Sequence, residues 1–163
     1  MNIRWSAALA FLILAFIAFY IYQRNSGTPA LSVNDFELRT LEGQKFDWDT
    51  LRGQKTILCL GASWCVSCVE ELRDLVFLKT GSLKDVNVVV ISDETEMRIR
   101  HFRDKGQYPF LFLRSEKRFE SMNIYSIPVT LLLNRRLNVV KERSGSFNWS
   151  DPSTAEHLLK IME

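Results

Sequence analysis

Residues 56–76 read TILCLGASWCVSCVEELRDLV, and this stretch decides the fold. The apolar run 56–60 is typical of a β-strand that is covered on both faces. Two cysteines follow, and from Cys68 onward apolar residues recur at helical spacing, at Val69, Leu72, Leu75 and Val76. The stretch therefore predicts a buried strand, a turn that carries a cysteine pair, and a helix that begins at that pair.

The cysteine pair carries the chemistry that the sequence predicts. Two residues, Val66 and Ser67, separate Cys65 from Cys68, so the two sulfurs can approach bonding distance across the first helical turn. Backbone N–H groups of that turn and the helix dipole favour a thiolate on Cys65, and a thiolate is the nucleophile of disulfide exchange. We expect Cys68 to be less exposed and to act as the resolving thiol. Trp64 is expected to shield the pair and to shape a docking surface, and the Ser67 hydroxyl to donate to a sulfur.

Two other uses of a cysteine pair fit this sequence less well. A structural zinc site needs four ligands, and the further candidates are Cys59, His101 and His157, with no second CxxC and no His pair at ligand spacing. An inert structural disulfide between Cys65 and Cys68 would close a very short loop and restrain the unfolded chain little. We therefore expect neither a metal nor a cofactor at this site.

The segments on both sides of the cysteines predict an α/β domain. Strands are expected at 86–91, 129–133 and 139–142, and helices at 92–105, at 116–122 and after Asp151-Pro152, with a short hairpin around 41–43 and a helix cap at Gly81. Strands that alternate with helices predict parallel pairs joined by helical crossovers. The final hairpin adds an antiparallel edge.

The N-terminal 24 residues have a different composition. Residues 5–22 are uncharged and largely apolar, and as a helix with a rise of ~1.5 Å per residue they span about 27 Å, close to the hydrocarbon thickness of a bilayer. Trp5, Tyr20 and Tyr22 lie near the ends of this run, where amphipathic rings favour the membrane interface. We expect residues 1–24 to form a membrane anchor. A cleaved signal peptide is the main alternative, and a buried soluble helix is the other.

The remaining residues predict a linker over 25–33 and one globular domain over 34–163. The chain has 21 Lys plus Arg against 19 Asp plus Glu, and without Arg4 and Arg24 the basic and acidic residues balance. A neutral domain does not suit nucleic-acid binding, which requires a basic excess. Arg4 and the α-amino group give a bias that favours an N-terminus inside and a domain outside the cytoplasm.

Three segments resemble a known family. Residues 35–68 read DFELRTLEGQKFDWDTLRGQKTILCLGASWCVSC and resemble the membrane-anchored TlpA/ResA-type thiol–disulfide oxidoreductases of the thioredoxin/redoxin superfamily. The segment SIPVT at 126–130 resembles the superfamily's cis-proline loop, and LLLNRRLNVVKERSGSFNW at 131–149 is similar to its terminal hairpin. The resemblance implies a thioredoxin-like fold, with a central mixed β-sheet flanked by helices and preceded by an N-terminal transmembrane helix.

The resemblance also implies roles for individual residues. Cys65 would attack a substrate disulfide and Cys68 would resolve the adduct. The Ile127-Pro128 bond would be cis, and Ile127 would pair with an extended substrate segment. Glu71 matches an acidic position that is common in the family's active-site helix, and a solvated surface carboxylate is the alternative for it.

The sequence departs from the family pattern near the cysteines. Cys59 stands where thioredoxins commonly have a buried Asp, and it is expected to be a small core residue, with a regulatory or third redox cysteine as the alternative. Val66-Ser67 replaces a dipeptide that often contains proline. Leu60-Gly61-Ala62 replaces the aromatic residues that usually precede the active-site Trp, which puts the reduction potential and the partner surface in doubt.

The resemblance implies an extracytoplasmic enzyme, periplasmic or at the cell surface, that reduces protein disulfides. Its substrates would include the haem-site cysteines of apocytochrome c during cytochrome c maturation, and a thiol protein of the membrane would supply the electrons. Two alternatives stay open: an oxidase or isomerase of secreted-protein disulfides, and a non-enzymatic copper-binding module or metallochaperone on the same fold. Redoxin peroxidases use a PxxxT/SxxC context that is absent from this sequence.

Overall fold

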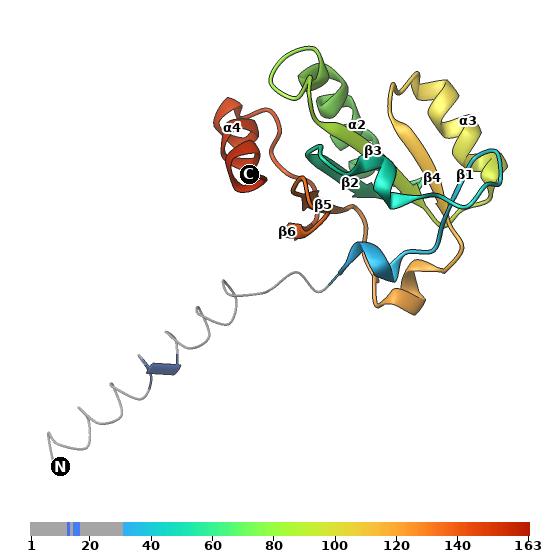
Figure 1. Cartoon of the computed structure of the whole chain (residues 1–163), viewed down its shortest axis with the longest axis horizontal. Coiled ribbons are helices and arrows are strands. Elements are labelled where there is room, and N and C mark those ends of the chain that lie inside the picture. The colour runs from blue at the N-terminus through green and yellow to red at the C-terminus, as the bar shows by residue number, and fades with distance from the viewer. Residues whose placement is uncertain (1–12, 14, 17–30) are drawn as a thin grey trace, which may run out of the picture. The chain divides into compact units, whose positions relative to one another are not determined.

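The computed structural model describes residues 13, 15, 16 and 31–163. Residues Leu31–Glu163 form a compact unit, whose centre is a six-stranded sheet in the order β1-β4-β3-β2-β5-β6 (Figure 1). The strands are β1 (Leu38–Thr40), β2 (Thr56–Leu60), β3 (Asn87–Ser92), β4 (Leu111–Ser115), β5 (Val129–Leu133) and β6 (Val139–Ser144). The pairs β2–β3 and β3–β4 are parallel, whereas β1–β4, β2–β5 and β5–β6 are antiparallel, which makes the sheet mixed as predicted.

Helices cover one face of the sheet and short 3₁₀ turns cover the other (Figure 1). The helices α2 (Val66–Lys79), α3 (Glu96–Gly106) and α4 (Pro152–Ile161) share a hydrophobic core with one set of alternating strand residues. The turns η1 (Val33–Asp35), η2 (Trp48–Leu51) and η3 (Phe119–Met122) share a second core with the other set. All residues of β2 are buried because the strand is central and covered on both faces.

Several elements differ from the sequence predictions. β4 was not expected, although it completes the parallel part of the sheet. The helix expected at 116–122 is a single 3₁₀ turn, Phe119–Met122, and α2 is capped by Thr80 rather than Gly81. α3 begins later than expected, with Thr95 as its N-cap, so Asp93 and Glu94 precede the helix.

Most of the predicted membrane anchor at 1–24 and linker at 25–33 lies outside the described residues. Of the apolar run 5–22, the structure describes Ile13, Ala15 and Phe16, and all three are helical. None of the helices within the described residues is long and apolar enough to cross a membrane.

Candidate active site

Cys65 and Cys68 lie at the point where β2 has ended and α2 begins. Cys65 is the N-cap of α2, and its Sγ accepts a hydrogen bond from the backbone N–H of Cys68 at 3.2 Å. The two sulfurs are bonded to each other, with 5.3 Å between the Cα atoms. The Ser67 hydroxyl lies 3.5 Å from Cys65 Sγ. The N-terminus of α2 therefore directs a backbone N–H donor and the positive end of the helix dipole at the sulfur of Cys65.

The two cysteines are buried, whereas the residues on either side of Cys65 are exposed to solvent. Cys65 and Cys68 are both buried, so the expected difference in exposure between them is not present in this oxidised state. Trp64 and Val66 on either side of Cys65 are 69% and 72% exposed. The ring of Trp64 therefore stands out from the domain beside the cysteines, where a partner can contact it.

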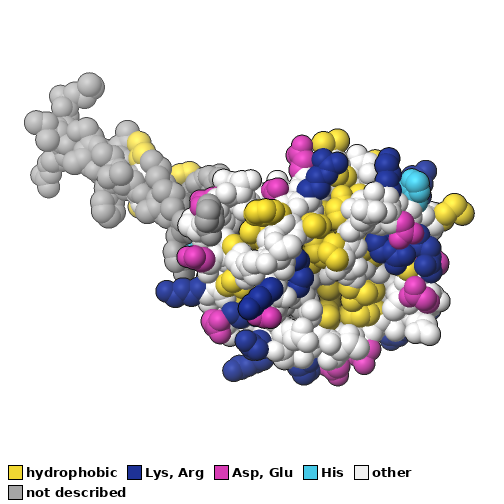
Figure 2. Space-filling view, turned by 90° about the horizontal axis from the view of Figure 1, so that it is seen from above, with side chains coloured by type: hydrophobic (Ala, Val, Ile, Leu, Met, Phe, Trp, Pro, Cys, Tyr) yellow, Lys and Arg dark blue, Asp and Glu magenta, His cyan; other side chains and the backbone are white. Residues whose placement is uncertain are grey.

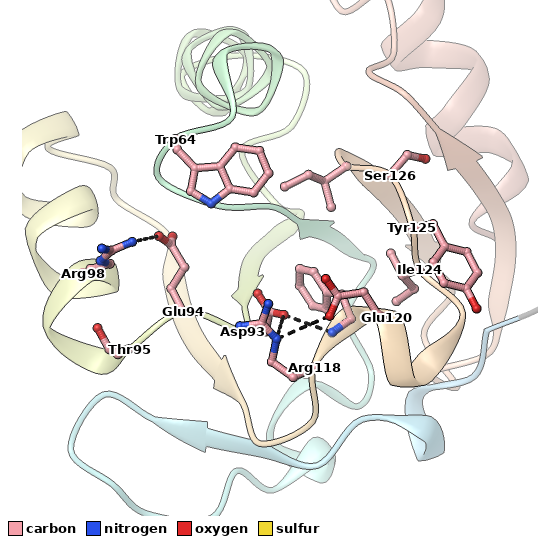
Figure 3. A pocket seen from close by; sticks show the side chains of 12 residues that line it. Trp64, Asp93, Glu94, Thr95, Arg98, Arg118, Glu120, Ile124, Tyr125 and Ser126 are labelled. Atoms are coloured by element: carbon pink, nitrogen blue, oxygen red, sulfur yellow. Dashed lines mark hydrogen bonds and ion pairs between the residues drawn. The ribbon is translucent and has the colours of Figure 1, made fainter.

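An open groove of about 440 Å³ runs from Trp64 to the loop before β5 (Figure 3). Ser126 and Ile127 line the groove, and the next bond, Ile127-Pro128, is cis, as predicted. Residues of the β3–α3 turn, α3 and η3 complete the lining: Asp93, Glu94, Thr95, Arg98, Arg118, Phe119, Glu120, Ile124 and Tyr125. The groove thus connects Trp64, at the start of the cysteine motif, to Ser126 of the cis-proline loop, 62 residues later in the sequence.

Two exposed aromatic side chains, those of Trp64 and Tyr125, lie at the groove. Tyr125 is exposed on the far side of the groove from Trp64 (Figure 3). Figure 2, seen from above the view of Figure 1, shows hydrophobic side chains gathered in the middle of one face, with Lys and Arg side chains toward its edges. Grouped apolar side chains on a soluble domain are typical of a contact surface for another molecule.

A buried carboxylate in the groove, that of Glu94, holds the loop that carries the cysteines. Glu94 accepts hydrogen bonds from the backbone N–H and the hydroxyl of Ser63, at 2.6 and 2.8 Å. Arg98 lies 3.7 Å from the same carboxylate, and Arg118 lies 3.4 Å from Asp93 (Figure 3). Because these carboxylates are largely buried and the two Arg side chains are 69% exposed, guanidinium groups face the solvent at the rim. The helix predicted at 92–105 would place Glu94 in its first turn, and nothing in the sequence indicated this contact, which spans 31 residues.

Glu71 is buried, so the interpretation of it as a solvated surface carboxylate was wrong. Its side chain projects from α2 into the core, and the residue is 2% exposed. Its Oε1 accepts hydrogen bonds from Thr130 Oγ1 (3.0 Å), Phe147 N (3.3 Å) and Trp149 Nε1 (3.0 Å). Burial raises the pKa of the Glu71 carboxyl, and these hydrogen bonds oppose the rise only in part.

Cys59 is a buried free thiol, in agreement with the expected core residue. It lies on β2 opposite Thr130 of β5. Burial first and the nearby Glu71 charge second raise the pKa of the Cys59 thiol well above its usual range, so the thiol stays protonated. Within residues 13, 15, 16 and 31–163, no three His, Cys, Asp or Glu side chains gather in a way that would hold a metal ion.

Comparisons with known proteins agree with this geometry. The model of the AhpC/TSA family matches residues 29–142. The sporulation thiol-disulfide oxidoreductase A of Bacillus subtilis is 28% identical over 86% of this chain and 83% of its own length. The thiol-disulfide oxidoreductase ResA of Halalkalibacterium halodurans is 25% identical over 68% of this chain and 65% of its own length. The matches span 63% to 83% of the lengths of the first curated relatives.

The comparison with solved structures supports the same similarity to thiol–disulfide oxidoreductases. The crystal structure of StoA from Bacillus subtilis superimposes with a TM-score of 0.55 and 26% identity, over 78% of this chain and 96% of that chain. Together with the ResA match, this structure confirms the resemblance that the motifs at 35–68 and 126–130 indicated. It also confirms the thioredoxin-like fold of the domain.

Proposed function

The chain belongs to the AhpC/TSA family, and from this membership we propose that it is a thiol–disulfide oxidoreductase whose redox pair is Cys65 and Cys68. One observation carries the proposal: Cys65 is bonded to Cys68 and caps α2, with its sulfur hydrogen-bonded to a first-turn N–H. A sulfur in this position is stabilised as a thiolate when the disulfide is reduced. The similarity to proteins named thiol-disulfide oxidoreductases supports the proposal.

The reaction exchanges one disulfide for another. The thiolate of Cys65 attacks one sulfur of a substrate disulfide, which forms a mixed disulfide and releases the first substrate thiolate. The thiolate of Cys68 then attacks Cys65 Sγ, releases the second substrate thiolate and restores the Cys65–Cys68 bond. The substrate disulfide gains two electrons, and the two protons of the dithiol leave with the substrate thiols. A second dithiol protein must return the electrons.

The substrate class follows from the groove. Proline has no N–H, so Pro128 leaves the neighbouring backbone edge open, and Ile127 next to it can pair with an extended segment. Trp64 and Tyr125 offer apolar rings on the two sides of the groove. We infer that the substrate is a protein disulfide in an extended segment, with apolar side chains next to the attacked cysteine.

Glu71, which is buried beneath the cysteine pair, acts as a proton acceptor for Cys68. It lies three residues after Cys68 on α2, so both side chains project from the same face of the helix. A buried carboxyl with a raised pKa exchanges protons near neutral pH more readily than a solvated one. Glu71 therefore accepts the proton of Cys68 when that thiol attacks the mixed disulfide.

A redox assay on the full-length chain tests the function and its direction. We expect the reduced chain to reduce insulin disulfides with dithiothreitol as donor, and we expect a reduction potential below that of glutathione. About 30 mV changes the two-electron equilibrium constant tenfold, so a titration against glutathione separates the two directions clearly. A potential far above that of glutathione would identify an oxidase or isomerase of secreted proteins instead. Absence of any exchange would contradict the proposal.

We further propose that residues 5–22 anchor the protein in the membrane, with the domain outside the cytoplasm, where it receives electrons from a membrane thiol protein. The apolar length of this run supports the proposal. Cytochrome c maturation, through reduction of apocytochrome cysteines, is the process we assign to it. The full-length chain should sediment with membranes, and a variant without residues 1–24 should not. Equal distribution of both forms in the soluble fraction would refute the anchor.

A further inference from the structure

We propose that Trp149 is a positioning residue of the active site, whose indole N–H fixes Glu71 so that the segment between β6 and α4 controls proton exchange with Cys68. The inference rests on the proposed dithiol function. It concerns a segment that follows the whole thioredoxin sheet and lies 81 residues after Cys68. From the sequence, Trp149 gave no indication of such a role.

The hydrogen bonds of Glu71 join three separate parts of the fold. Thr130 donates from β5, the strand that follows the cis-proline loop. Phe147 donates through its backbone N–H and Trp149 through its indole N–H, both from the segment between β6 and α4. Trp149 is itself 2% exposed and packs against Phe147, with ring centroids 5.2 Å apart. The indole is thus held in a rigid position, and it holds the carboxyl in turn.

All three donors lie on one oxygen of Glu71. Oε1 receives every hydrogen bond, whereas Oε2 is buried and has no partner among the described residues. The N–H groups of Phe147 and Trp149 cannot accept a hydrogen bond, so these two donors disfavour a proton on Oε1, and the proton of neutral Glu71 is favoured on Oε2. A buried polar atom without a partner costs free energy, and in native structures a catalytic role is one explanation for such an atom.

Where α2 packs on β2, Glu71 lies deeper in the core than Cys68, one turn further along the helix. A Cβ atom added to Gly61 would lie 3.0 Å from Cys68 Sγ, so the sulfur rests directly on the end of β2. Cys59 is the next residue on that face of the strand, and the charge of Glu71 acts on its thiol. The interface between α2 and β2 therefore contains two neighbouring contacts. Cys68 lies against Gly61 at the end of the strand, and Glu71 lies near Cys59, two residues earlier in the chain.

Few charged groups face Glu71. Arg143 of β6 lies over the Phe147 ring and lowers the pKa of the Glu71 carboxyl slightly, whereas α4 adds apolar side chains to the same core. On α2 and β2, the thiols of Cys59 and Cys68 are the buried titratable groups besides Glu71, and the other charged side chains of α2 are partly or fully exposed. Burial raises the pKa of Glu71, and among the opposing effects the Trp149 hydrogen bond is the largest. Loss of that bond therefore raises the pKa of Glu71 further.

Trp149→Phe tests the proposal because phenylalanine keeps a ring against Phe147 but has no donor. With the reduced full-length chain and 5,5′-dithiobis(2-nitrobenzoate), the second thiolate release reports the attack of Cys68 on the mixed disulfide. We expect the pH midpoint of this step to rise by about one unit in the variant, since a hydrogen bond to an ionised group changes its proton affinity about tenfold. In a Glu71→Gln background the same substitution should leave the pH profile unchanged. A shift that persists without Glu71 would overturn the proposal.

A measurement on the unsubstituted chain covers the case in which Trp149→Phe does not fold. The indole N–H resonance of Trp149 should shift between about pH 4 and pH 9 with the same midpoint as the second release, and Glu71→Gln should abolish that shift. A resonance that stays constant contradicts the inference. Absence of a second thiolate release from the wild-type chain would refute the dithiol function itself, which keeps the two failures distinct.

Discussion

Cys65→Ala is expected to abolish thiol–disulfide exchange by the full-length chain. The substitution removes the sulfur that caps α2, and Cys68, which lies inside the first turn, has no comparable set of free N–H donors. Loss of a nucleophile lowers the rate of such reactions by three orders of magnitude or more, on the order of 10³ to 10⁶. The rate of insulin reduction with dithiothreitol as donor measures the effect.

Cys59→Ala is the matched control for this variant. The Cys59 thiol is buried and stays protonated, so its removal should leave the reduction rate within about twofold of the wild type. Full turnover by Cys65→Ala would contradict the assignment of the nucleophile. A loss of activity in Cys59→Ala, with the fold intact by circular dichroism, would instead identify Cys59 as a third redox cysteine.

Cys68→Ala is expected to convert the enzyme into a covalent trap for its substrate. Cys65 keeps its position and still attacks, but the mixed disulfide has no resolving thiol and therefore accumulates. When the variant is expressed in its native cells, it should give a higher-mass adduct on non-reducing gels, and a reductant should remove that adduct. Mass spectrometry of the adduct identifies the captured protein and the residues that flank its cysteine.

The double variant Cys65→Ala/Cys68→Ala controls for unspecific capture. It should give no adduct, because Cys59 is buried. An equal yield of adducts from the double variant would show that the captured bonds do not come from Cys65. Captured cysteines that lie only in polar, helical segments would contradict the substrate class that the groove indicates.

The site at the start of α2 was predictable because its signals are local. An apolar run predicts β2, apolar residues at helical spacing predict α2, and the cysteines lie between the two. The cis bond at Ile127-Pro128 followed from a resemblance to a known loop. β4 was missed because its five residues are held as a strand by pairing with β1 and β3, and both partners are distant in the sequence.

The burial of Glu71 was missed because glutamate side chains are mostly exposed to solvent. Its position carried the opposite signal: residues 68, 71, 72 and 75 share one face of α2, and the other three are buried as expected. The partners of the carboxyl come from segments 59 to 78 residues away, and no local pattern predicts such contacts. The same holds for Glu94, whose contact with Ser63 joins two separate loops.

The central claim is that the first turn of α2 stabilises Cys65 as a thiolate, and the rate of its alkylation tests this most directly. In the reduced full-length chain, iodoacetamide at about pH 6.5 should modify Cys65 first and about tenfold or more faster than it modifies free cysteine, whose thiol is largely protonated at that pH. A rate no higher than that of free cysteine, or a Cys65 that the reagent does not reach, would contradict the account.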